Sequence, residues 1–359
     1  MKTHTISHAL QSCVAAIGLF ALATSSTASA ESQSGPHAQD SQLCSLGFSA
    51  AGQPGTLICK NITTGAVTQS VPVGAMNAGP GGGAGSLARH EKRVLATNQS
   101  QGAVLFALAG GQLTSPVTLQ TDGESSLSGV LSDRGAYVLT GTRLLFFPRG
   151  EMTAASSQPL LVADGSAAQV TLAGGYAYVS EKNGSLEAFS LGHDGNIRGH
   201  ATPVAGVPAG VIVGIVGVGD VVVAPIAHLA SNANQSSIPV ASGLSVAQIV
   251  PTKEVAACWA ASDGDEACIT NPGSMTVSCG HVGSESFTSY TSAAASLPGE
   301  TVFDIDMMDT LVGILGKSNG TPVLLAFSRT KQSGDFLSLM NQFPLGTATA
   351  TGAVLLPPL

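Results

Sequence analysis

The stretch AYVSEKNGSLEAFS (177–190) decides the fold, because it is one copy of a unit that recurs along the chain. Each copy joins a short apolar strand, a turn that contains Gly or Asn, and a second apolar strand. Further copies are RVLATNQSQGAVLFAL (93–108), AYVLTGTRLLFF (136–147), 220–242, EACITNPGSMTVSC (266–279) and 310–328. Equivalent positions are spaced by 43, 41, 44, 46 and 44 residues, and they are Val94, Tyr137, Tyr178, Val222, Cys268 and Val312. A period of about 40–50 residues with four short strands per unit predicts a β-propeller.

The strands of one unit can be assigned to positions in a blade. We interpret the quoted hairpins as strands B and C, and the apolar runs ahead of them as the innermost strand A. Those runs are GVL (129–131), QVTL (169–172), GVIVGIV (210–216), CWAA (258–261) and VFDI (302–305). The fourth strands, such as PLLVA (159–163), follow the hairpins.

The two ends of the chain complete the count of blades. GTLICKNITTGAVTQSVPV (55–73) supplies a seventh, N-terminal copy, but that unit lacks one strand. GAVLLPP (352–358) can complete it, and this closure pairs strands that would otherwise be exposed sheet edges. The sequence therefore predicts an all-β, seven-bladed β-propeller closed by its N- and C-terminal strands. A β-sandwich with extra strands is the alternative.

The N-terminal 30 residues have the parts of a secretory signal peptide. Lys2 is followed by the apolar run 13–23, which is shorter than the about 20 residues of a membrane span, and by Ala28-Ser29-Ala30. We predict a signal peptide at 1–30, a flexible leader at 31–42 and the propeller at 43–359. A buried N-terminal helix is the alternative for the first segment. The expected location is extracellular, or periplasmic in a Gram-negative bacterium.

The composition limits the classes of partner. Charged residues make up 10% of the chain, against about 25% in ordinary globular domains. Removal of Lys2 leaves 13 basic residues against 22 acidic ones, a net charge of about −9. No clustered basic face or second long apolar run is evident, so we expect neither nucleic-acid binding nor a membrane span in the mature chain. The expected partner is a protein, a glycan or a small molecule, and we expect a monomer.

Five cysteines follow the signal peptide, and export permits disulfides. A turn centred between Ala51 and Gly52 places Cys44 opposite Cys59, which predicts a disulfide. A turn near Pro272-Gly273 places Cys268 opposite about Val277 and diagonal to Cys279, on one face, which predicts a second disulfide. Cys258 falls on the other face, and we expect a buried free thiol there.

Neither cofactors nor metals are expected, because Cys-x-x-Cys pairs and histidine clusters at metal-ligand spacing are absent from the sequence. Five glycosylation sequons occur, and our strand assignment puts each in a turn between strands B and C. They begin at Asn61, Asn98, Asn183, Asn234 and Asn319.

The repeats resemble the lactonase-like seven-bladed β-propellers, the group of 6-phosphogluconolactonase and fungal carboxymuconate cyclase. The most similar stretches are GGYAYVSEKNGSLEAFSLGHDGNIRG (174–199) and VAACWAASDGDEACITNPGSMTVSC (255–279). The resemblance implies an acid/base Glu in the hairpin after a Tyr-x-Tyr strand, and Glu181 falls within a residue of that position. It also implies a His-containing stretch near Ala167-Ala168-Gln169-Val170, where neither His nor Arg occurs.

Catalysis on an anionic lactone needs cations to hold the substrate and a group that moves a proton. The predicted connections between blades instead carry mainly acids: Asp122, Glu124, Asp164, Glu254 and Glu300, with Lys253. Arg143, in a neighbouring turn, is the residue that could supply a cation. We therefore expect a binding module without the anionic-lactone chemistry of the family. The alternatives are a hydrolase or isomerase of a neutral lactone, and a structural surface protein.

Overall fold

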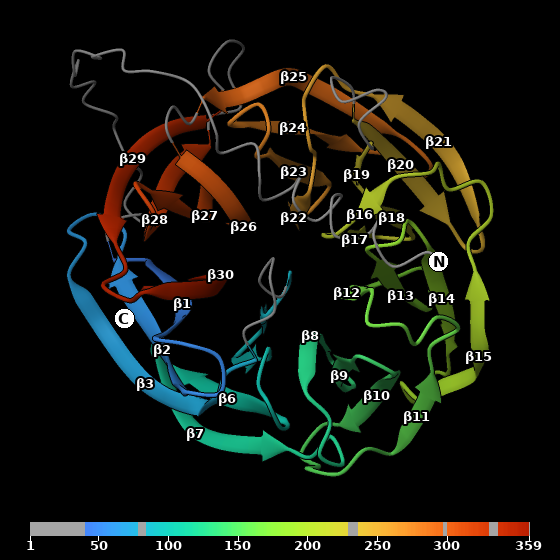
Figure 1. Ribbon diagram of the computed structural model, residues 1–359, viewed down its shortest axis with the longest axis horizontal. Coiled ribbons are helices and arrows are strands. Elements are labelled where there is room, and N and C mark those ends of the chain that lie inside the picture. The colour runs from blue at the N-terminus through green and yellow to red at the C-terminus, as the bar shows by residue number, and fades with distance from the viewer. Residues whose placement is uncertain (1–39, 78–83, 229–235, 297–299, 330–336, 359) are drawn as a thin grey trace.

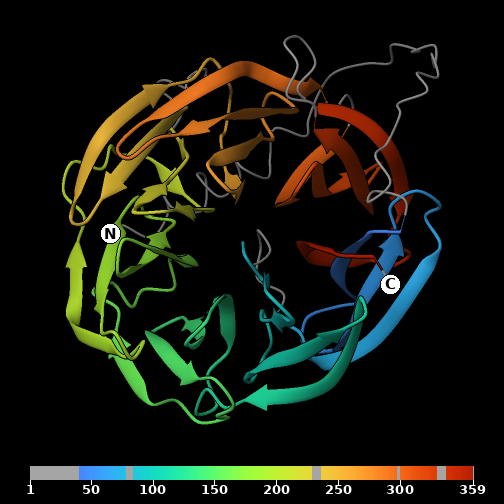
Figure 2. The same ribbon diagram turned by 180° about the vertical axis from the view of Figure 1, so that it is seen from behind.

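The structure is a computed structural model that describes residues 40–77, 84–228, 236–296, 300–329 and 337–358. The predicted signal peptide, and the leader up to residue 39, lie outside the described residues. The described residues form strands and turns only, and among them no helix is long and apolar enough to cross a membrane. Seven sheets surround a central axis (Figure 1), and the same ring is visible from behind (Figure 2).

Each blade has its innermost strand, A, at the axis and its outermost strand, D, at the rim. The first three blades, from strand A to strand D, are as follows. Blade 1 contains β30 (Thr349–Leu356), β1 (Gln42–Phe48), β2 (Pro54–Asn61) and β3 (Val67–Ala75). Blade 2 contains β4 (Leu87–His90), β5 (Arg93–Ala96), β6 (Ala103–Ala109) and β7 (Gln112–Leu119). Blade 3 contains β8 (Ser126–Ser132), β9 (Gly135–Thr140), β10 (Arg143–Pro148) and β11 (Ser156–Pro159).

Blades 4, 6 and 7 likewise consist of four uninterrupted strands each. Blade 4 contains β12 (Ala167–Ala173), β13 (Tyr176–Glu181), β14 (Leu186–Leu191) and β15 (Ile197–Pro203). Blade 6 contains β22 (Trp259–Asp263), β23 (Glu266–Asn271), β24 (Thr276–Val282) and β25 (Phe287–Ser296). Blade 7 contains β26 (Glu300–Met308), β27 (Leu311–Ser318), β28 (Thr321–Arg329) and β29 (Leu337–Pro344).

Blade 5 is irregular, because its two inner strands are interrupted. Strand A is split into β16 (Val211–Ile212) and β17 (Val216–Val218), and strand B into β18 (Val221–Val223) and β19 (Ile226–Ala227). Strands C and D are β20 (Ser237–Ser242) and β21 (Ser245–Pro251). Pro225 lies between β18 and β19 and has no N–H to donate, which accounts for the break in strand B.

The predicted closure of the ring is confirmed. β1 pairs antiparallel with β30, so the first and last strands share blade 1. This pairing corrects the assignment of 55–73, which we expected to form strands B and C. The C-terminal strand takes position A and β1 takes position B, so β2 and β3 form strands C and D.

The prediction for the fourth strand of blade 3 is also wrong in position. The strand is β11, which ends at Pro159, so PLLVA lies almost entirely beyond it. The N–H groups of Leu161 and Val162 donate to the buried carboxylate of Glu187 at 3.0 and 3.1 Å. Those backbone donors are therefore satisfied by a side chain instead of a neighbouring strand.

The rim is protected from edge-to-edge pairing without the use of charge. The seven outermost strands contain a single Lys or Arg, Arg198, yet six of the seven contain a proline. Most of them also pair with strand C through a register shift, as in blades 1, 2, 4, 5, 6 and 7. Proline and bulges both interrupt the continuous row of donors and acceptors that another chain could pair with.

The two predicted disulfides are present, and each joins strands B and C of its blade. Cys44 faces Cys59 across β1 and β2, and Cys268 faces Cys279 across β23 and β24. The register of the second pair differs from the expected diagonal, because Asn271 pairs with Thr276 and leaves a four-residue turn. Cys258 is disulfide-bonded as well, so the expectation of a free thiol is wrong. These bonds indicate an oxidising compartment.

Candidate functional site

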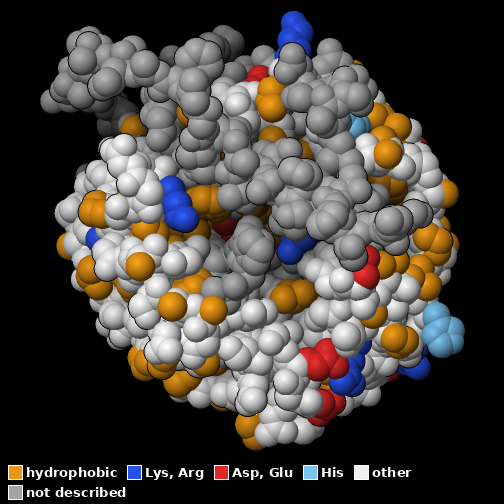
Figure 3. Space-filling view, in the orientation of Figure 1, with side chains coloured by type: hydrophobic (Ala, Val, Ile, Leu, Met, Phe, Trp, Pro, Cys, Tyr) orange, Lys and Arg blue, Asp and Glu red, His pale blue; other side chains and the backbone are white. Residues whose placement is uncertain are grey.

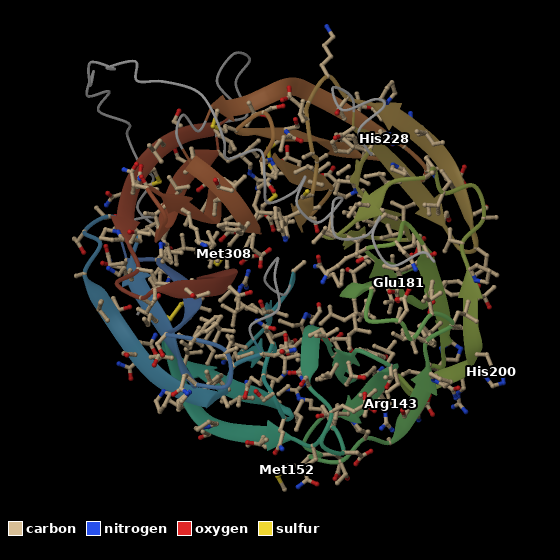
Figure 4. The ribbon with its side chains drawn as sticks, in the orientation of Figure 1. Arg143, Met152, Glu181, His200, His228 and Met308 are labelled. Carbon is tan, nitrogen blue, oxygen red and sulfur yellow. A yellow bond between two sulfur atoms is a disulfide. The ribbon has the colours of Figure 1, made fainter. Side chains whose placement is uncertain are left out.

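The strand order creates two faces. The turns between strands B and C, and the connections from strand D to the next strand A, form one face, called here the B–C face. The turns between strands A and B, and between strands C and D, form the opposite A–B face. Glu181 ends β13 in blade 4 and Arg143 begins β10 in blade 3, so both belong to the B–C face (Figure 4). The described side chains visible in Figure 3 include few charged groups.

Glu181 is completely buried, with 0% of its surface exposed. The Ser166 hydroxyl donates to Glu181 Oε2 at 2.7 Å, and Oε1 has no hydrogen-bond partner among the described residues. Burial raises the pKa of Glu181 to about 8, and the nearby carboxylates of Glu187 and Asp164 favour the same direction. Burial also lowers the pKa of the adjacent Lys182. At neutral pH the Glu181 carboxyl is therefore mostly protonated and sealed from solvent.

Arg143 is held by acids and is not free to reach the axis. Its Nε donates to Glu124 Oε1 at 2.7 Å, its Nη2 also contacts that oxygen, and Asp122 lies 3.7 Å from Nη1. The Thr142 hydroxyl donates to the other oxygen of Glu124 at 2.7 Å. Burial works against ionisation of Glu124, but the hydrogen bonds from Thr140, Thr142 and Arg143 leave its pKa below the usual value.

The remaining described acids of the predicted connections have the same kind of local role. Asp164 accepts the Ser166 N–H at 2.8 Å, and hydrogen bonds from the Ser166 side chain, the Ser166 N–H and Asn183 lower its pKa. Glu254 is buried and accepts from the Thr276 hydroxyl at 2.7 Å. Each acid thus fastens the connection into a blade to the B–C turn of that same blade. Lys253 is exposed, and the Glu300 side chain lies outside what the structure describes.

The propeller axis is occupied by the chain itself. The Ser128 hydroxyl and the Gly129 N–H of blade 3 both donate to the Gly85 carbonyl at 3.2 Å. A Cβ on Gly85 would lie 2.8 Å from Gln169 Nε2 of blade 4. Asp304 of blade 7 accepts a backbone hydrogen bond from Gly85. Because these blades lie on different sides of the ring, Gly85 lies close to the axis.

Ala84 is buried in the apolar cluster that also contains Trp259 and Val302. Gln169 lies within 167–170, the region near which the resemblance implies a His-containing stretch. Its Oε1 accepts the Ile215 N–H at 3.0 Å, so Gln169 bonds blade 4 to blade 5. The sequence did not reveal that Ala84 and Gly85, which precede the innermost strand of blade 2, lie at the centre of the ring.

Two acids of β26, the buried Asp304 and the half-buried Asp306, were also missed, although VFDIDMM places them in an otherwise apolar strand. Asp304 accepts the Ile305 and Ala353 N–H groups at 3.0 and 3.2 Å, and Asp306 accepts the Leu355 N–H at 2.7 Å. Burial raises the pKa of Asp304 to about 8 and also raises that of Asp306. Both carboxyls fasten blade 7 to the closing strand β30, so their role is structural.

One group of potential metal ligands occurs in the described part of the chain: His90, Glu91 and Asp133 on the A–B face. Sequence spacing did not reveal it, because Asp133 comes from the next blade. His90 Nε2 lies 2.8 Å from Asp133 Oδ1, and Arg149 lies 3.8 Å from Glu91. Both acids are exposed and already have partners, Asp133 with His90 and Glu91 with Arg149, so the group forms a local network of its own.

The sequons are distributed over both faces. Asn98, Asn183 and Asn319 lie in B–C turns, as predicted, whereas Asn61 ends β2 and lies in a C–D turn on the other face. This expectation was wrong because β2 is strand C of its blade. Asn98 is buried, Asn183 and Asn319 are exposed, and Asn234 lies outside the described residues.

Comparisons with known proteins agree on the fold. Protein-family models and curated proteins gave no match. A candidate 6-phosphogluconolactonase from Bacteroides fragilis has a similar structure, with a TM-score of 0.59 and 14% identity over 88% of this chain and 98% of that chain. A second, from Bacteroides uniformis, has a TM-score of 0.57 and 12% identity over 88% of this chain and 100% of the other.

AztD from Citrobacter koseri is similar too, with a TM-score of 0.54 and 10% identity over 89% of this chain and 99% of that chain. Identities this low show the fold alone. The chain is thus a seven-bladed β-propeller with the fold of the lactonase-like group, as its repeats indicated.

Proposed function

We propose that this protein is an exported propeller that binds a partner and does not catalyse the lactone chemistry of the proteins that it resembles. The observation that carries this proposal is the filled axis, where Gly85 bonds to blades 3 and 7 and lies against Gln169 of blade 4. Ligands of propellers commonly bind at the mouth of a central opening. Here that position is occupied by backbone.

The chemistry of the described residues supports the same conclusion. An anionic lactone needs cations at the binding site, and Arg143 is neutralised by Glu124 and Asp122. A carboxylate about 4 Å from an anion costs on the order of 1 kcal/mol even in bulk water. The acid/base residue that the resemblance implies, Glu181, has no exposed surface through which to meet a substrate.

A hydrolase of a neutral lactone is the alternative, and one observation favours it. Glu181 has a pKa of about 8 and a serine hydroxyl 2.7 Å away, which are properties of general acids and bases. Such a function requires movement that exposes Glu181.

We expect the purified protein to hydrolyse neither 6-phosphogluconolactone nor a neutral lactone above the buffer rate, and not to cyclise carboxymuconate. The reason is the buried Glu181 together with the paired Arg143. Steady-state assays of the wild type, Glu181→Gln and Arg143→Ala should give the same background rate. Turnover by the wild type that Glu181→Gln abolishes would establish the hydrolase alternative.

The A–B face is the surface that we propose for partner binding. Its described, exposed Lys and Arg side chains all belong to blades 2–4, where acids accompany them: Lys92, Arg134, Arg149 and Arg198. In the described part of blades 5–7, the exposed charged side chains on this face are acids: Asp220, Asp265, Glu285 and Asp309. Uneven charge of this kind fixes the orientation of a partner and steers association.

A charge-reversal experiment tests this surface. The immobilised double variant Arg134→Glu/Arg149→Glu is expected to lose a partner that the wild type retains from the extracellular fraction of the source organism. Lys253→Glu, an exposed cation on the B–C face, is the matched control and should retain it. Equal retention by all three proteins, or equal loss by both variants, would contradict the placement of the surface.

A further inference from the structure

Two Asn-Gly pairs occur in the sequence, Asn183-Gly184 and Asn319-Gly320. In such a pair the glycine nitrogen can attack the asparagine side-chain carbonyl, because glycine has no side chain to obstruct the approach. Both pairs lie in B–C turns, of blade 4 and blade 7 respectively, and both have an exposed asparagine. Their sequences alone give the two sites similar reactivity.

The structure holds Asn183 in place. Its Oδ1 accepts the Ser185 N–H at 2.9 Å, and its side chain is hydrogen-bonded to Asp164. The nitrogen that would attack, that of Gly184, donates to the Glu181 carbonyl at 2.9 Å. A Cβ at Gly184 would lie 2.4 Å from the Gly210 oxygen, so the backbone there is packed against blade 5.

The surroundings of Asn319 are open. Ser318 pairs with Thr321, which leaves Asn319 and Gly320 as a two-residue turn between β27 and β28. Their φ angles of 49° and 80° are typical of a type I′ turn. No hydrogen bond to the Asn319 side chain is present among the described residues, and no heavy atom lies within 4 Å of a Cβ position on Gly320. The turn can therefore rearrange without breaking contacts to another blade.

We propose that Asn319 is a site of spontaneous deamidation, whereas Asn183 is protected. The Gly320 nitrogen forms a bond to Asn319 Cγ, the bond from Cγ to the amide nitrogen breaks, and ammonia leaves with the proton of the Gly320 N–H. Water then opens the resulting succinimide to aspartate or isoaspartate. The net reaction is hydrolysis of an amide, and it needs no oxidant or reductant.

The modification changes the B–C face beside the innermost strand of blade 7. It adds one negative charge two residues from Lys317, whose Nζ lies 5.3 Å from the centre of the Phe303 ring. Isoaspartate also adds a methylene to the backbone of a tight turn. The Lys317–Phe303 contact is the first interaction that the product can alter.

The test is a time course of the folded, purified protein at mildly alkaline pH, produced without N-glycans because a glycan would occupy the Asn319 amide. Peptide mapping should show the mass gain of amide-to-acid conversion at Asn319 roughly tenfold or more faster than at Asn183, which corresponds to about 1.4 kcal/mol. The same protein unfolded in denaturant is the control, and there the two rates should converge. Equal rates in the folded protein, or a faster reaction at Asn183, would overturn the proposal.

Discussion

The thermal unfolding midpoint of this protein is expected to fall by on the order of 5–10 °C as the pH rises from about 5 to about 9. Glu181 and Asp304 are the cause, because their folded pKa values of about 8 lie far above the ordinary values of 4.5 and 3.8. At a pH between the ordinary and the folded pKa values, these two carboxyls stay protonated in the folded protein but are ionised in the unfolded chain. The stabilisation that each carboxyl contributes is complete at pH values below its pKa in the unfolded chain. It is lost as the pH rises through the pKa of that carboxyl in the folded protein, at about 1.4 kcal/mol per group and pH unit.

The acids with lowered pKa values do not cancel this effect. Asp194, whose pKa is held at about 2 by Asn196 and Arg198, and Asp133, whose pKa is lowered by its hydrogen bond to His90, act only at more acidic pH. Differential scanning calorimetry at several pH values measures the slope. Glu181→Gln should flatten it and the exposed Asp122→Asn should not. A midpoint that rises between pH 5 and 9 would show that the buried carboxyls are ionised.

Gly85→Val is expected to cost on the order of 4 kcal/mol of unfolding free energy, the largest effect of a single substitution that we predict. Gly85 has a φ of +59°, and a Cβ there would lie 2.8 Å from Gln169 Nε2 and 3.0 Å from Ser128 Oγ. Valine brings two further carbons into that contact. Gly85 would have to withdraw from the axis, which would break its bonds to blades 3 and 7.

The control variant Gly264→Val separates the loss of unfolding free energy caused by steric overlap from the loss caused by a left-handed backbone conformation. Gly264 has nearly the same φ, +62°, but no heavy atom lies within 4 Å of its Cβ position. This control should lose only the about 1–2 kcal/mol that a left-handed conformation costs a residue with a side chain. Chemical denaturation of both variants gives the difference. Equal losses would mean that the axis is not tightly packed around Gly85.

The sequence repeat by itself determined the propeller architecture. A strand–turn–strand pattern depends on neighbouring residues only, and its regular spacing can be read directly from the sequence. The Cys44–Cys59 pairing was also local, since one short connection sets the register of β1 and β2. The position of a strand within its blade was not always local. The hairpin of β2 and β3 has the sequence pattern of strands B and C. It forms strands C and D instead, because β30, nearly 300 residues away, takes the innermost position of the blade.

The tertiary structure decided the properties of the candidate site. The resemblance implied Glu181, and the turn assignment indicated Arg143. In the structure Glu181 is buried and hydrogen-bonded to Ser166, and Arg143 is neutralised by Glu124, each partner coming from a separate connection. Contacts with blades 3, 4 and 7 place Gly85 at the axis, and nothing in the sequence around Gly85 indicates them. Strand formation follows from side chains that alternate along a few residues. Desolvation and charge pairing depend instead on which blades the closed ring brings together.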